Sequence, residues 1–136
     1  MNRAEPILVI LLRCIAVASA LAVVPVFMPY AWMDLCHRRL GLHTLPQLPV
    51  IVYLTRSLSA MYVFHGGLLW LVARDVHRYA GLITYLGLAF LVFGAVVLGI
   101  DLHAQLPWFW VVSEGPVEIV VGLAILLLQR RVTSPA

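Results

Sequence analysis

The chain has 136 residues, of which 63% are hydrophobic and only 11% are charged, and its formal net charge is +3. A soluble domain of this size has roughly a quarter of its residues charged, so this composition excludes an ordinary soluble fold. The basic residues are dispersed arginines, which gives no support for nucleic-acid binding. The apolar residues fall into four blocks, each near the ~20 residues that a helix needs to cross a bilayer. The sequence therefore predicts an all-α integral membrane protein, a single domain over residues 1–136.

The first predicted span covers about residues 7–28. Its apolar run is longer than the roughly 7–15 residues of a signal-peptide core, so we interpret it as a retained span. The alternative is a signal peptide cleaved near Ala18-Ser19-Ala20. Arg13 lies inside this span, and we expect its side chain to extend to the nearer surface, with Glu5 close by. Pro29 ends the span.

The first loop begins with a predicted short helix over residues 30–40. Its apolar and polar side chains fall on opposite sides at helical spacing, which is typical of a helix that lies in the membrane interface. Gly41 suits its C-terminal cap. The apolar side has Trp32, Leu35, Cys36 and Leu40, and the polar side has Asp34, His37 and Arg38.

Three further spans are predicted, at about residues 50–73, 79–100 and 107–129. The second is unusual because Arg56 and His65 lie within it, and ionisable groups at that depth are costly and need a partner or a role. For the last span we expect a helix that begins at Pro107 and kinks near Pro116. The alternative is a short straight helix that begins near Ser113.

The distribution of arginines predicts the orientation of the chain. Five arginines flank one side of the predicted spans and two lie in loops on the other, so we place both termini and the turn 74–78 in the cytoplasm. We expect the bacterial inner membrane as the location. The cytoplasmic set is Arg3, Arg74, Arg78, Arg130 and Arg131, and the outer set is Arg38 and Arg39.

Small residues recur every seven positions in the predicted spans, which favours close helix packing in lipid. We therefore expect an antiparallel bundle of four transmembrane helices, with the glycines serving packing. The small-residue lines are Ala60 and Gly67 in the second span, Ala80, Gly87 and Gly94 with Asp101 in the third, and Gly115 and Gly122 in the fourth.

The most specific group of candidate site residues is Arg56 with three carboxylates. Arg56 precedes Arg74 by 18 residues, or ~27 Å of helix. Glu114 and Glu118 share one helix face, and Glu118 lies within reach of the Arg56 guanidinium. Asp101 lies near the same outer level. We predict an ion pair between Arg56 and Glu118, Glu114 or both that locks the bundle; the alternative is a polar pocket open to the outside.

No residue pattern indicates a catalytic centre, a cofactor site or a metal site. His65 is rotated by half a turn from Arg56 and no second histidine shares its depth, so we expect a structural histidine rather than a haem ligand. Asp101 and His103 together with His37 could bind a metal ion, but two loop histidines are weak support for such a site. The two cysteines form no Cys-x-x-Cys motif, and we expect no disulfide.

Two stretches carry a resemblance to a known group of proteins. Leu11-Leu12-Arg13 in the first span and RSLSAMYVFHGGLLW over residues 56–70 resemble the DoxX-like small four-helix bacterial membrane proteins and related families of unknown function. The resemblance implies a four-helix membrane fold and, for some members, quinone-linked oxidation of thiols or sulfur compounds. This chain has no paired-cysteine centre, and the resemblance assigns no catalytic residue.

Two functions follow as hypotheses. The first, which we prefer, is a non-enzymatic accessory subunit of an inner-membrane assembly, with the lipid bilayer around it and a membrane protein or a second copy as partner. The second is a quinone-linked or small-ligand-binding membrane protein that uses an outer-leaflet pocket at Arg56 and Glu118. A small multidrug-type transporter is disfavoured, because those proteins have an essential glutamate in the first span, where this chain has Arg13.

Overall fold

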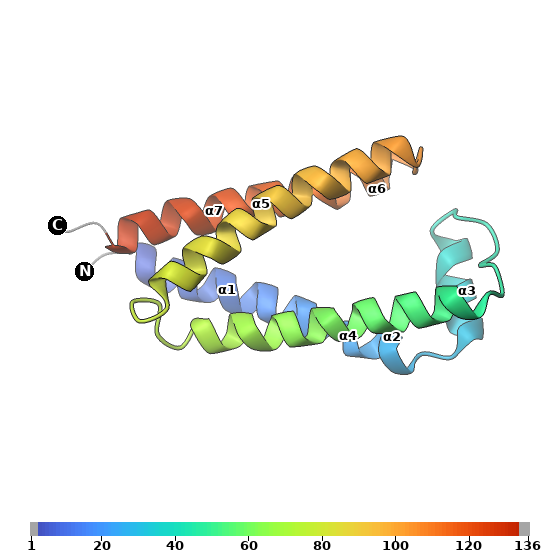
Figure 1. The fold of residues 1–136 in the computed structure, drawn as a ribbon, viewed down its shortest axis with the longest axis horizontal. Helices are drawn as coiled ribbons and strands as arrows, with labels where there is room; N and C mark the ends of the chain where they lie inside the picture. Colours follow the sequence, from blue (N-terminus) through green and yellow to red (C-terminus); the bar gives the residue numbers. More distant parts are fainter. Residues whose placement is uncertain (1–2, 134–136) are drawn as a thin grey trace. The chain divides into compact units, whose positions relative to one another are not determined.

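A computed structural model describes residues 3–133, and this part of the chain is helical without any strand (Figure 1). The chain divides into two compact units, which we call the terminal unit (residues 3–12 and 71–133) and the middle unit (residues 13–70). The helices are α1 (Ala4–Ala20), α2 (Val23–Phe27), α3 (Tyr30–Arg39), α4 (Pro49–Val72), α5 (Ala80–His103), α6 (Trp108–Ser113) and α7 (Gly115–Thr133).

Three stretches are long and apolar enough to cross a membrane: Ala4–Phe27, Ala80–His103 and Trp108–Thr133. These three candidate spans overlap three of the predicted ones and indicate a membrane protein. Helix α4 has 24 residues, as many as α5, yet it is not among the three. Its length suffices, so the shortfall is in mean hydropathy, which Arg56 and His65 lower. The fourth span stays a prediction.

The first predicted span is not one continuous helix, because it is interrupted between Ala20 and Val23. The sequence did not predict this interruption. Helix α1 ends at Ala20 and α2 begins at Val23. Pro25 has no N–H to donate within a helix. In a helical backbone its ring would also clash with the carbonyl of Leu21, four residues earlier. The Leu21 carbonyl instead accepts a bond from the Val24 N–H at 3.1 Å, which tightens the chain into a turn.

Helix α3 confirms the short helix predicted over residues 30–40, and Gly41 ends it as expected. Gly41 has a φ of 76°, a left-handed conformation that a glycine adopts without a steric penalty. Its N–H binds the Arg38 carbonyl at 3.0 Å, and the Leu42 N–H binds the His37 carbonyl at 3.1 Å. These two bonds are the Schellman arrangement, which satisfies carbonyls that the helix end leaves free.

Helices α5 and α7 lie side by side in the terminal unit and meet along glycines (Figure 1). A Cβ placed on Gly94 would lie 2.7 Å from the Gly115 carbonyl oxygen, and one on Gly122 would lie 2.7 Å from the Gly87 carbonyl oxygen. The pairs run in opposite chain directions, so the helices are antiparallel. The predicted packing role of these four glycines is confirmed.

In the middle unit the close approach involves Gly66 rather than Gly67. A Cβ on Gly66 would lie 2.7 Å from the Ala16 carbonyl oxygen, whereas one on Gly67 would meet no heavy atom within 4 Å. Within the middle unit, the packing against α1 therefore does not use the line predicted through Ala60 and Gly67. The spacing of seven residues from Ala60 pointed to Gly67. The packing against α1 instead involves Gly66, which is rotated from Gly67 by about 100° around the helix.

The last span is kinked, as predicted. Helix α6 ends at Ser113, Glu114 has non-helical dihedral angles (φ −105°, ψ −83°), and α7 begins at Gly115. The break precedes Pro116 because the proline ring conflicts with the carbonyl four residues earlier, that of Val112. The start after Pro107 is also confirmed, since Pro107 directly precedes α6.

Candidate functional site

The four candidate site residues come from both units. Asp101 lies on α5, Glu114 lies at the break between α6 and α7, and Glu118 lies on α7, so the structure brings the three carboxylates onto one helical hairpin of the terminal unit. Arg56 lies on α4 in the middle unit. The ion pair between Arg56 and a glutamate is therefore a contact between units, and it stays a prediction.

Asp101 is a buried residue of α5 rather than a loop residue. The helix continues to His103, three residues beyond the predicted end of the span, and Asp101 continues the sevenfold line of Gly87 and Gly94. Its exposed fraction is 3%, and its Oδ2 atom has no hydrogen-bond partner among residues 3–133. A buried carboxyl oxygen without a hydrogen-bond partner is unfavourable, so Asp101 is a residue for which a donor from elsewhere is expected.

Glu118 lies on the side of α7 that packs against α5. A Cβ on Gly94 would lie 2.9 Å from the Glu118 Cβ, so the glutamate stem occupies the space that a glycine leaves open. The Glu118 Oε2 atom is buried and, like the Asp101 Oδ2, has no hydrogen-bond partner in the described part of the chain. Two of the three predicted carboxylates thus carry an unsatisfied oxygen within this hairpin.

Glu114 differs from the other carboxylates because it has a partner on its own segment. Its Oε2 accepts a hydrogen bond of 2.6 Å from the indole Nε1 of Trp110, four residues earlier. The Glu114 N–H also binds the Trp110 carbonyl at 3.1 Å, which carries the chain through the break. The sequence analysis missed this contact, although the spacing of four residues is the signal that indicates it.

Arg56 also has a partner that the sequence analysis missed. Its exposed guanidinium donates a hydrogen bond of 3.3 Å to the carbonyl oxygen of Met28. Met28 caps α2 in an extended conformation, and the N–H of Trp32, four residues later, binds the Pro29 carbonyl at 3.0 Å. The Met28 carbonyl therefore receives no helical hydrogen bond from Trp32. A guanidinium has several further N–H donors, and the bond to Met28 leaves most of them available for a carboxylate.

Arg13 contacts an aromatic ring, and Glu5 has another partner than the one expected. The Arg13 guanidinium carbon lies 5.6 Å from the centre of the Trp70 ring, a cation–π contact within the middle unit. Glu5, which we expected near Arg13, pairs instead with His77: the Glu5 Oε2 lies 3.3 Å from the His77 Nε2. Both side chains of this second pair are about half exposed, so it contributes little to stability.

Neither the arrangement of possible metal ligands nor a comparison with known proteins indicates another site in the described part of the chain. Within residues 3–133, no three His, Cys, Asp or Glu side chains lie close enough together to hold a metal ion. Cys14 and Cys36 are free and exposed. No protein-family model, curated protein or solved structure matches the chain.

Proposed function

We propose that the chain is a four-span protein of the bacterial inner membrane, related to the DoxX-like group, with both termini in the cytoplasm. The support for α4 as the remaining span is its surface. It exposes a stripe of large apolar side chains at helical spacing, a surface that suits lipid and is unfavourable in water. The stripe consists of Leu54, Leu58, Met61, Phe64, Leu68 and Leu71.

Within this placement, Arg56 binds the carboxylate of Glu118 and joins α4 to the hairpin of α5 and α7. The observation that carries the proposal is the buried Oε2 of Glu118, which has no partner among the described residues. An arginine with free donors is the group that such an oxygen needs, because a charge in lipid is tolerated when it is paired. Asp101, whose Oδ2 is also unsatisfied, is the outer neighbour of this pair.

The protein acts as a non-enzymatic accessory subunit of a membrane assembly. Two of the four candidate residues have a structural contact within their own unit: Glu114 binds Trp110, and Arg56 on α4 binds the end of α2. Polar groups used in this way specify helix arrangement rather than chemistry. The apolar faces of the helices then serve as the contact surface for lipid and for a partner subunit.

A double-mutant cycle tests the central contact. Arg56→Ala and Glu118→Ala, alone and combined, are compared by reversible unfolding of detergent-solubilised protein. We expect a coupling free energy of about 0.5–3 kcal/mol, because contacting residues are not additive. Glu114→Ala is the matched control, since Glu114 is bound to Trp110 and its effect adds to that of Arg56→Ala. Additivity with Glu118→Ala would show that Arg56 serves only the Met28 carbonyl.

Copurification from mild detergent separates the two classes of function. An accessory subunit brings down a membrane protein in fixed stoichiometry, and Arg56→Ala leaves that partner bound in proportion to folded protein. A quinone that copurifies with the wild type and is lost in Arg56→Ala, without a protein partner, would contradict the accessory role. It would favour a ligand-binding pocket at Arg56 and Glu118 instead.

A further inference from the structure

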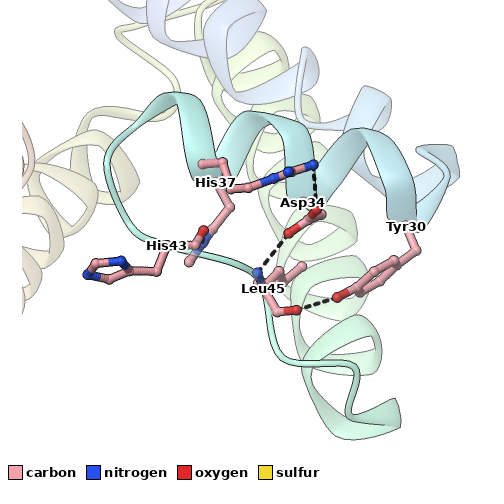
Figure 2. A network of polar contacts seen from close by, with 6 residues as sticks. Tyr30, Asp34, His37, His43 and Leu45 are labelled. Atoms are coloured by element: carbon pink, nitrogen blue, oxygen red, sulfur yellow. Dashed lines mark hydrogen bonds and ion pairs between the residues drawn. The ribbon is translucent and has the colours of Figure 1, made fainter.

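Helix α3 has one face that is committed to its own loop. Tyr30, Asp34 and His37 follow the spacing of a single helix face, and Figure 2 shows them directed at the loop that returns toward α4. The Tyr30 hydroxyl donates to the Leu45 carbonyl, and the Asp34 Oδ1 accepts a bond of 2.8 Å from the Leu45 N–H. The His37 Nδ1 lies 3.0 Å from the His43 carbonyl oxygen.

These bonds fix the rotation of α3 about its own axis. Asp34 has a second bond, from its Oδ2 to the Arg38 guanidinium at 2.9 Å, so both of its oxygens are used. Met33 lies on the same side of the helix and is buried, with an exposed fraction of 7%. On the polar face, the Tyr30 hydroxyl, both Asp34 carboxyl oxygens and the His37 Nδ1 atom are thus engaged by the protein itself. Whatever meets α3 from outside therefore meets the opposite face.

The opposite face is apolar around a single arginine. Trp32, Leu35, Cys36 and Arg39 repeat the same spacing on the other side of the helix, and all four are exposed. Trp32 is 64% exposed and Leu35 is 47% exposed. The last turn of the helix is basic, and the carboxylate of Asp34 on the same helix is paired with Arg38. We call these four residues the outer face of α3.

The chain connections hold this face beside the bilayer. Helix α3 begins three residues after Phe27, the end of a membrane-length stretch, which is at most about 10 Å of extended chain. The loop after α3 leads directly into α4 at Pro49. A tryptophan suits the headgroup level of a membrane, and a guanidinium suits the geometry of a phosphate.

We propose that the outer face of α3 is a docking surface for anionic phospholipid headgroups. Trp32 and Leu35 enter the boundary between headgroups and acyl chains, while Arg39 binds the phosphates. The bonds of Tyr30, Asp34 and His37 to the loop already hold α3 in this orientation, so the helix need not become ordered when lipid binds. The inference rests on the proposed four-span placement, and it adds a lipid class and the residues that recognise it.

The natural cysteine on this face provides the test. In Cys14→Ala protein, a nitroxide on Cys36 reports the depth of the outer face; the matched control has Thr44→Cys in a Cys14→Ala, Cys36→Ala background, with its label on the loop. Both proteins are reconstituted in phosphatidylcholine vesicles, alone or with about one quarter phosphatidylglycerol. Relaxation by oxygen marks a label in lipid, and relaxation by a water-soluble nickel chelate marks a label in water.

We expect the Cys36 label to respond to oxygen and the Thr44 label to the nickel chelate. The ratio of lipid-immersed to water-exposed Cys36 label rises with phosphatidylglycerol, and Arg39→Gln lowers that ratio about fivefold in the anionic vesicles only. Arg39 is an exposed residue, and far-UV circular dichroism verifies that the variant is folded. An equal ratio in both vesicle types, unchanged by Arg39→Gln, would overturn headgroup recognition.

Two other outcomes would also overturn the docking surface. A Cys36 label that responds only to the nickel chelate places the face in water, and one that responds to neither reagent places a protein partner on it. Alkaline carbonate extraction of the same vesicles keeps these results separate from the proposed function. Protein that stays in the membrane pellet while the Cys36 label is in water refutes the docking surface alone; protein that is extracted refutes the four-span placement.

Discussion

Replacing Gly94 by alanine tests the closest helix contact in the terminal unit. The added Cβ would lie 2.7 Å from the Gly115 carbonyl oxygen and 2.8 Å from the Ile119 nitrogen. Both are backbone atoms of α7, so the contact is not relieved by rotating a side chain. The two helices have to separate or shift along each other, and every neighbouring contact of the seam is then lengthened.

Two opposing effects determine how much Gly94→Ala changes the free energy of unfolding. Adding a methyl group to a tightly packed site lowers the stability of a protein by about 1–3 kcal/mol. Alanine in place of a mid-helix glycine stabilises by about 1 kcal/mol. Gly99→Ala is the matched control, because Gly99 lies on the same helix, is exposed, and has no heavy atom within 4 Å of an added Cβ. The difference between the two variants removes the propensity effect, so we expect Gly94→Ala to be less stable than Gly99→Ala by about 1–3 kcal/mol.

Reversible unfolding in mixed micelles of mild detergent and dodecyl sulfate, followed by far-UV circular dichroism, gives both free energies of unfolding. Gly99→Ala should equal or exceed the wild type in stability, and Gly94→Ala should fall below Gly99→Ala. Equal stabilisation by the two substitutions would refute the reasoning, because it would mean that α5 and α7 do not meet at backbone distance.

Two further predictions concern the middle unit. Asp34→Ala removes the acceptor of the Leu45 N–H and should destabilise the loop by about 1.5–3 kcal/mol, seen as faster hydrogen exchange of the Leu45 amide; Arg38→Gln, which removes only an exposed pair, should lower stability by less than about 1 kcal/mol. Trp70→Leu removes the ring beneath Arg13 and should destabilise by about 0.5–2 kcal/mol, and this loss should vanish in an Arg13→Leu background.

The sequence was sufficient where a feature depends on local chemistry. Gly41 was expected at the end of α3, and it takes the left-handed conformation that the Schellman bonds require. Pro116 was expected to kink the last span, and the break lies two residues before it. The break at Pro25 has the same physical cause, but the uninterrupted apolar run around it concealed the signal. Apolar composition indicates that a segment can lie in lipid, but it does not reveal where a proline removes a hydrogen bond from the helix.

Contacts between helices were harder to predict, because they depend on rotation about each helix axis. Gly66 and Gly67 are adjacent in sequence and face different directions, and only the packing against α1 distinguishes them. The predicted depth of Glu114 and Glu118 relative to Arg56 was counted along each span separately. It gave no information on Trp110, which satisfies Glu114, or on the Met28 carbonyl, which accepts from Arg56.

The glycine seam and the buried carboxylates, treated separately in the sequence, form one feature of the terminal unit. Glu118 approaches α5 because Gly94 has no side chain, and Asp101 is buried because it continues the same line one heptad later. The close backbone contact that stabilises the hairpin therefore also removes two carboxyl oxygens from solvent. A membrane protein tolerates that arrangement when a donor reaches the oxygens from another helix.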